Sequence, residues 1–240
     1  MVGGLVRSLV EWVPTSVTSV SVLSGPLAIL GYLAGSIPFG YLLSRRRLRR
    51  QLAGDPSVRT TRSGEDPLDT PGVIGAGALA ALATLLVTTV AWDVAITAAP
   101  RGNIGAIGTF SNQAVGAWVS VALWTGMAAV VGNIAPVWTA FRGATGLAPA
   151  VALVLAHVPV VFVVCAATFL VAYALTRETR LSLLITLPVA VSVEYLAWIA
   201  DVQTSWGVTN GPEVTLWIAV LAGALAARNL RPAAGRRPAG

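Results

Sequence analysis

Long apolar segments recur along the whole chain and restrict it to a membrane fold. They occupy residues 25–44, 74–98, 114–131, 147–156, 159–175, 181–199 and 213–229. A helix needs about 20 mainly apolar residues to cross a bilayer, and several of these segments reach that length. The composition agrees, with 55% hydrophobic residues, 11% charged residues and a mean hydropathy of +0.76. We therefore predict an all-α, polytopic membrane protein with seven transmembrane helices.

The fourth apolar segment is short, and Pro159 separates it from the fifth. Two interpretations are open. Residues 148–156 and 159–175 form two helices joined by a tight turn, or they form one long helix that is kinked at the proline. We adopt the first, which gives seven spans and places the two termini on opposite sides of the membrane.

The arginines set the orientation. All 16 basic residues are arginine, and cytoplasmic loops of membrane proteins are enriched in basic residues. If the loop after the first span is cytoplasmic, 14 of the 16 fall on that side, and only Arg7 and Arg101 lie outside. This distribution beside apolar segments also argues against a nucleic-acid partner, despite a net charge of +6.

The termini and the domain boundaries follow from this orientation. We predict that the N-terminus lies outside and the C-terminus in the cytoplasm. Residues 1–24 form an outer N-terminal segment, residues 25–231 a single seven-helix membrane domain, and residues 232–240 a basic C-terminal tail.

A polar, glycine-rich segment over residues 132–146 separates the third and fourth apolar segments. It contains three glycines, a proline and Arg142. Glycines let a backbone approach a ligand closely, and consecutive N–H groups form a concave anion site. Arg142 adds a positive charge that persists at any working pH. The predicted topology brings this segment to the cytoplasmic face together with residues 55–65 and 226–231, so we predict a phosphate site there.

Other candidate positions have plainer alternatives. Residues 55–65 could hold an anionic headgroup or form an ordinary solvated loop. The break at Ser36–Gly40 could line a cavity or only kink a helix. Asn133 could bind a phosphate or an ester oxygen, or belong to a simple connection. The sequence shows no metal-ligand cluster, no GxSxG and no P-loop, so no metal and no cofactor are expected.

Four motifs appear in order over roughly residues 30–231. The stretch 35–43 matches GSIPFGYLL throughout, and residues 58–65 keep the arginine, serine and glycine of a D-I-R-x-x-G-S-G-N loop. Residues 132–146 align without a gap with G-H-x-F-P-V-F-x-x-F-K-G-G-K-G, and residues 228–231 echo R-E-N-I-R. Together these motifs resemble the acyl-phosphate-dependent glycerol-3-phosphate acyltransferases of the PlsY type, which are seven-span enzymes of the bacterial inner membrane.

The resemblance implies an acyltransferase of phospholipid biosynthesis in the inner (plasma) membrane of a bacterium. The enzyme would transfer an acyl chain from acyl phosphate to glycerol 3-phosphate, with membrane lipids as its surroundings. Ser63 and Asn133 would be the catalytic residues. The substrate-binding residues would be Ser36, Arg59, Gly64, Gly132, Arg142, Gly143, Thr145, Gly146 and Asn229.

The chain departs from the family pattern at several of these positions. Asn133 stands where the family pattern has a histidine. Arg142 and Thr145 replace the two lysines of the family loop, and Arg228 replaces the glutamate of its C-terminal motif. These changes leave a second hypothesis open. The chain would be a catalytically impaired relative that binds a lipid or a phosphate, or a partner of lipid-synthesis proteins.

The first loop motif has two possible locations. The order and spacing of the motifs favour Ser63 as the serine of the first loop motif. However, Glu65 occupies the position where the family has an asparagine. Residues 102–106, which include Asn103, match the G-N-x-G-A core better and lie one span later. The sequence sets neither the acyl-chain preference nor the oligomeric state.

Overall fold

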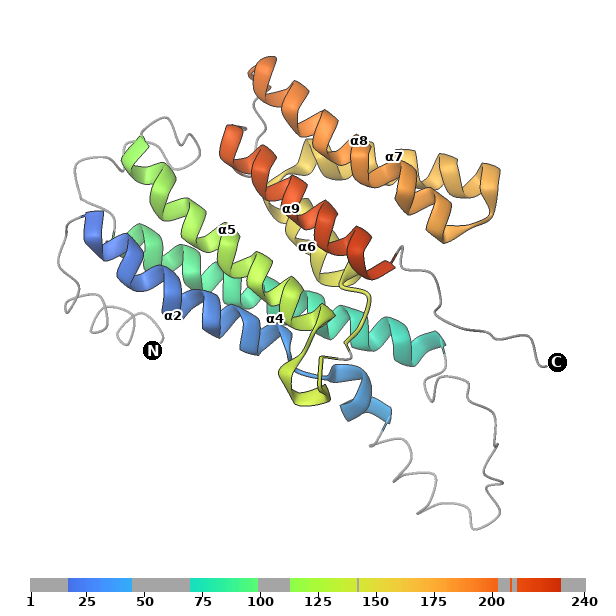
Figure 1. Ribbon diagram of the computed structural model, residues 1–240, viewed down its shortest axis with the longest axis horizontal. Coiled ribbons are helices and arrows are strands. Elements are labelled where there is room, and N and C mark those ends of the chain that lie inside the picture. Colours follow the sequence, from blue (N-terminus) through green and yellow to red (C-terminus); the bar gives the residue numbers. More distant parts are fainter. Residues whose placement is uncertain are drawn as a thin grey trace, which may run out of the picture.

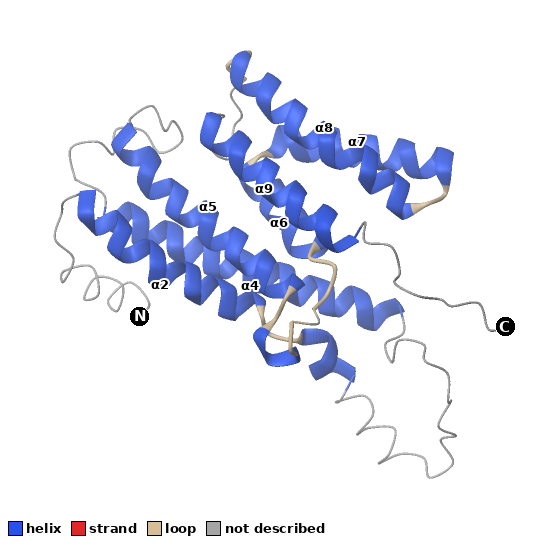
Figure 2. Ribbon diagram, in the orientation of Figure 1, coloured by secondary structure: helices blue, strands red, loops and turns tan. Residues whose placement is uncertain are grey.

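Every regular element that the structure describes is a helix (Figure 2). The computed structural model describes residues 17–44, 70–98, 113–141, 143–202, 208 and 211–229. Its elements in chain order are α2 (Val17–Gly35), α4 (Thr70–Ala98), α5 (Gln113–Ile134), the 3₁₀ turn η1 (Val137–Thr139), α6 (Leu147–His157), α7 (Pro159–Thr176), α8 (Thr179–Ile199) and α9 (Pro212–Asn229). The all-α fold expected from the sequence is confirmed.

Five stretches of the described chain are long and apolar enough to cross a membrane. They are Leu23–Ser44, Gly72–Ala95, Ser120–Thr139, Pro159–Thr176 and Thr179–Ile199. Helix α6 has 11 residues, which at 1.5 Å per residue is about half the thickness of a bilayer core. Helix α9 is not among the five and carries Glu213 in its first turn and Arg228 in its last. The seven spans therefore stay a prediction.

Helix boundaries follow the prolines and differ in places from those expected. Helix α2 begins at Val17, inside the segment predicted to lie outside the membrane domain, and ends at Gly35, beside the break expected at Ser36–Gly40. Pro38 explains this end, because the residues before a proline are biased away from the helical region. Val158 separates α6 from α7, and Pro159 occupies the first turn of α7. Two helices, the first of the two interpretations, are therefore what forms.

The helices pack in two groups that a central pair connects (Figure 1). Helices α2 and α4 both pack on α5, and α7 pairs with α8. Helix α6 contacts α4 and α7, whereas α9 contacts α8 and α5. Trp217 of α9 is fully buried in the core, and its indole Nε1 donates a hydrogen bond to the carbonyl oxygen of Leu123, at 2.9 Å.

Small residues allow α2 and α5 to approach closely. A Cβ at Gly31 would overlap the carbonyl oxygen of Thr125, and one at Gly35 would overlap that of Ala129. A Cβ at Gly132 of α5 would in turn overlap the carbonyl oxygen of Tyr32. Gly31 and Gly35 are four residues apart and lie on one helix face, the spacing that lets two helices in a membrane pack backbone against backbone.

We expect Gly31→Val to lower the melting temperature of the detergent-solubilised protein by several degrees. Overpacking a tight contact costs about 1–3 kcal/mol, because the two helices must separate. Gly25→Val is the matched control, since a Cβ at Gly25 of the same helix meets nothing within 4 Å. Equal melting temperatures for the two variants would contradict the close packing of α2 on α5.

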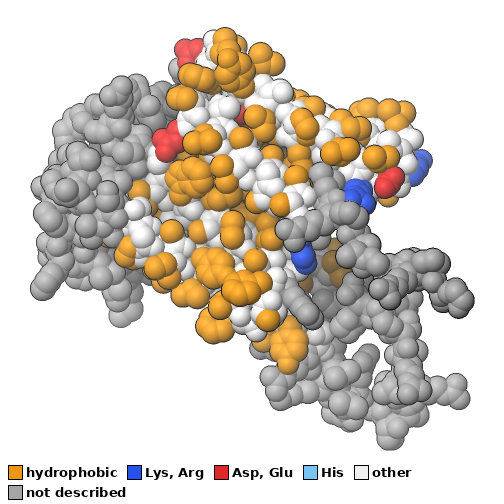
Figure 3. Space-filling model, viewed as in Figure 1, with side chains coloured by type: hydrophobic (Ala, Val, Ile, Leu, Met, Phe, Trp, Pro, Cys, Tyr) orange, Lys and Arg blue, Asp and Glu red, His pale blue; other side chains and the backbone are white. Residues whose placement is uncertain are grey.

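Hydrophobic side chains cover most of the described surface in Figure 3. The blue arginine side chains gather toward the end where the α7–α8 turn and the C-terminal end of α9 lie (Figures 1 and 3). A hydrophobic surface with charges collected at its ends is what a membrane-embedded bundle requires.

Candidate functional site

The glycine-rich segment forms a compact loop between α5 and α6. Helix α5 ends at Ile134, and the backbone turns through η1 into Ala140 and Phe141, which adopt left-handed φ angles of 51° and 63°. Gly146 precedes α6 with a φ of +74°. A Cβ at Gly146 would also meet the Ile134 side chain at 2.5 Å. The end of the loop at Gly146 therefore packs against Ile134, the last residue of α5.

Gly143 is the point of closest approach within this loop. The N–H of Ala144 donates a hydrogen bond to the carbonyl oxygen of Asn133, at 3.0 Å. A Cβ on Gly143 would overlap that same oxygen, the carbonyl oxygen of Ile134 and the Pro136 ring. Only glycine permits this contact, which explains the glycine at this position of the motif.

The C-terminal end of α9 holds the loop in place through side-chain hydrogen bonds to loop carbonyl oxygens. The guanidinium of Arg228 donates from Nε to the carbonyl oxygen of Ala144, at 3.2 Å, and from an Nη to that of Gly143. The Asn229 amide donates to the carbonyl oxygens of Thr145, at 3.1 Å, and of Leu225, at 2.9 Å. Residues 84 positions apart in the sequence therefore meet in one site.

A cavity of about 920 Å³ opens beside the tied loop. Its walls come from the break after α2, the first turns of α4, the loop, the start of α6 and Arg228. Asn133, Gly143 and Thr145 line it. The Asn133 side-chain amide has no hydrogen-bond partner among the described residues, so it is available to a ligand in the cavity.

Other predicted site residues lie behind the cavity wall. Ser36 is buried, and its hydroxyl donates to the carbonyl oxygen of Tyr32 at 2.7 Å. Gly132 lies against α2, and Gly146 lies under the loop at the start of α6. These three, like Asn229, shape the site and are not among the residues that line the cavity. Their roles in substrate binding stay predictions.

Four predicted site residues lie outside the described residues. They are Arg59, Ser63, Gly64 and Arg142. Asn103, the alternative to Ser63, also lies outside them.

Sequence reasoning missed Arg228 as a site residue. The signal was a basic residue in the last turn of the last apolar helix, on the same predicted side as the glycine-rich loop. In the sequence, Arg228 counts only as one of the cytoplasmic arginines and as a departure from the family motif. The walls supplied by Pro136, Ala144 and the start of α4 were also missed, because apolar and small residues there carry no chemical signal.

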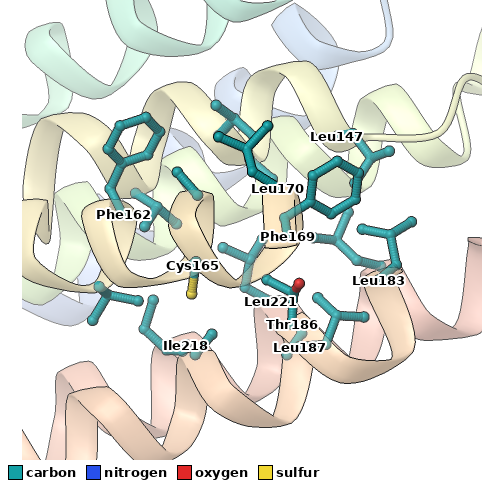
Figure 4. A pocket seen from close by; sticks show the side chains of 18 residues that line it. Leu147, Phe162, Cys165, Phe169, Leu170, Leu183, Thr186, Leu187, Ile218 and Leu221 are labelled. Carbon is teal, nitrogen blue, oxygen red and sulfur yellow. The ribbon is translucent and has the colours of Figure 1, made fainter. Parts of the chain in front are cut away.

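A second cavity, of about 420 Å³, lies between α6, α7, α8 and α9 (Figure 4). Its walls are almost entirely apolar, and they include Phe162, Phe169, Leu187 and Leu221. The hydroxyl of Thr186 also lines it, but that group is satisfied because it donates to the carbonyl oxygen of Ser182, at 2.7 Å.

Leu147 lines both cavities. Figure 4 shows it at the edge of the apolar cavity, where the glycine-rich loop enters α6. The two cavities therefore share Leu147 as a wall residue, and the larger one also has Asn133, Thr145 and Arg228 in its wall. Within the described part of the chain, no group of three or more His, Cys, Asp or Glu side chains could hold a metal ion.

The family model described as glycerol-3-phosphate acyltransferase matches residues 26–234, most of this chain. The chain belongs to the glycerol-3-phosphate acyltransferase family. The glycerol-3-phosphate acyltransferase of Azotobacter vinelandii is 33% identical over 174 residues, which are 72% of this chain and 79% of that protein. The enzyme of the same name from Rhizobium etli is 33% identical over 169 residues, which are 69% of this chain and 72% of that protein.

The fold of this acyltransferase family is also found among solved structures. Crystal structures of PlsY, described as an integral membrane glycerol 3-phosphate acyltransferase, match with a TM-score of 0.52 in both a glycerol 3-phosphate form and a lysophosphatidic acid form. The glycerol 3-phosphate form is 20% identical, and the match covers 85% of this chain and 87% of that chain. The predicted family resemblance and the predicted class, a membrane acyltransferase, are confirmed.

Proposed function

We propose that this chain transfers an acyl chain from acyl phosphate to the 1-hydroxyl of glycerol 3-phosphate and releases lysophosphatidate. The single observation that carries the proposal is that Leu147 lines both cavities. The two substrates need polar groups that bind phosphate and an apolar space for a hydrocarbon chain, with the reacting carbonyl between them. The larger cavity supplies Asn133, Thr145 and Arg228, and the smaller one has apolar walls.

The polar cavity offers several groups to a phosphate. Thr145 lines this cavity, and within the described chain its N–H group has no hydrogen-bond acceptor. It lies just before the N-terminal end of α6, where the helix dipole attracts anions. Arg142 belongs to the same loop in sequence. We assign one phosphate to these groups and the other to Arg59 and Ser63, as the family motif implies.

The chemistry needs positioning more than a strong base. The hydroxyl oxygen attacks the acyl carbonyl carbon, the bond from that carbon to the phosphate oxygen breaks, and phosphate leaves with the electron pair. The hydroxyl proton passes to a phosphate oxygen. Holding both substrates in this geometry supplies much of the rate. Asn133 orients the hydroxyl or donates a hydrogen bond to the developing negative charge on the carbonyl oxygen.

The proposal is tested with purified protein, acyl phosphate and glycerol 3-phosphate. We expect lysophosphatidate to form, and Arg142→Ala to reduce its formation about tenfold or more, because a hydrogen bond to a charged group is lost. Product from the wild type that is no higher than from Arg142→Ala would sink the enzyme proposal.

A catalytically impaired relative is the second candidate, and Asn133 and Thr145 favour it. An asparagine cannot shuttle a proton, and a threonine brings no charge to a phosphate. Saturable binding of glycerol 3-phosphate without turnover would support this candidate.

We further propose the topology of seven spans with an outer N-terminus and a cytoplasmic C-terminus, in the inner membrane of a bacterium. The arginine distribution supports it. The test is a membrane-impermeant thiol reagent on single-cysteine variants at residues 7 and 236 of a Cys165→Ser background. We expect labelling from opposite sides of the membrane, and labelling of both from one side would exclude this topology.

A further inference from the structure

We infer that Arg228 has two functions: it fixes the glycine-rich loop, and it supplies a positive charge that binds the phosphate group of a substrate in the polar cavity. This inference deepens the proposed function and rests on it. The ligand is a phosphate monoester, carried either by glycerol 3-phosphate or by acyl phosphate.

The donor geometry of Arg228 leaves part of the guanidinium for a ligand. An arginine side chain carries five N–H donors in a planar fork. Two of them are used, toward the carbonyl oxygens of Gly143 and Ala144. The other three have no partner among the described residues, and Arg228 is one of the residues that line the cavity.

The charges around the cavity favour an anion. Among the described residues that line it, Arg228 is the cation, and none is an aspartate or a glutamate. No carboxylate of the described chain forms an ion pair with Arg228. An exposed, unpaired guanidinium held rigidly by two carbonyls loses little freedom when it binds a phosphate, which makes such a contact favourable.

A purely structural function is the competing explanation, because a cation at the end of a helix can serve only to satisfy loop carbonyls. The variant Arg228→Lys separates the two possibilities. A lysine keeps the positive charge but lacks the planar fork that holds the carbonyl oxygens of Gly143 and Ala144 together. Arg228→Lys therefore loosens the loop and leaves the charge of the cavity unchanged.

The experiment measures binding before turnover. Wild type, Arg228→Gln and Arg228→Lys are titrated calorimetrically in detergent with glycerol 3-phosphate and, separately, with palmitoyl phosphate. We expect Arg228→Gln to weaken binding of one of the two ligands by about tenfold or more. Arg228→Lys restores most of that affinity. The KM for the same ligand follows the binding constant, and added salt weakens wild-type binding more than that of Arg228→Gln.

Each other result has a defined meaning. Unchanged affinities in Arg228→Gln overturn the inference, as do equal losses of affinity in Arg228→Gln and Arg228→Lys. Failure of the wild type to bind either ligand also overturns it. Wild-type binding without lysophosphatidate formation would sink the acyltransferase proposal and still decide the role of Arg228 from the binding constants.

Discussion

We expect Gly143→Ala to lower the rate of acyl transfer by about 100-fold or more. The added Cβ would overlap the carbonyl oxygens of Asn133 and Ile134 and the ring of Pro136. None of these is the end of a flexible side chain, so the backbone of the loop must move. A displacement of about 1 Å at a positioning group costs a rate factor of that size.

Gly223→Ala is the matched control for Gly143→Ala. Gly223 lies on α9, where a Cβ meets nothing within 4 Å, so alanine is expected to leave activity unchanged. Circular dichroism separates loss of the loop from loss of the fold, since the helices should persist in both variants. Wild-type activity in Gly143→Ala would mean that the loop does not position the substrates.

We expect Ala166→Trp to change which acyl chains the enzyme accepts. Ala166 of α7 lines the apolar cavity, and an indole there occupies space that the chain would fill. Each methylene displaced from an apolar site costs about 0.8 kcal/mol. The kcat/KM for palmitoyl phosphate should therefore fall about tenfold or more, while that for butyryl phosphate should change little, because a short chain ends near Leu147.

The neighbouring residue provides the control for Ala166→Trp. Ala167 is exposed on the same helix, and Ala167→Trp adds the same indole outside the cavity. Both variants are assayed with acyl phosphates of increasing length. If Ala166→Trp and Ala167→Trp show the same chain-length profile as the wild type, the apolar cavity does not hold the acyl chain.

The sequence predicted the helices well, because apolar length and proline positions are properties of short segments of the chain. Apolar length located the helical segments, and Pro159 marked the division between α6 and α7. The break at Ser36–Gly40 was also visible in the sequence, and α2 ends beside it at Gly35. Hydrophobicity records the surroundings of a residue and does not record whether its backbone stays helical.

The motif residues were a different case. The motif spacing at residues 132–146 pointed to the family but did not separate residues that line the cavity from residues that support its wall. Ser36 and Gly132 belong to the same motifs as Pro38 and Asn133, which line the cavity, yet Ser36 and Gly132 pack where α2 meets α5. Which side of a wall a residue occupies depends on helix rotation, and the near-uniform apolar composition of these helices leaves that rotation unmarked in the sequence.

The sequence by itself determined the membrane class, the positions of the apolar helices, the family and the glycine-rich loop, because each depends on composition or on neighbours along the chain. Only the tertiary structure brought Arg228 onto the carbonyls of Gly143 and Ala144 and made Leu147 a wall residue of both cavities. The position of Arg228 depends on how α9 packs on α5 and α8. Packing between distant helices is decided by the shapes of both partners at once, so no single segment of the sequence carries it.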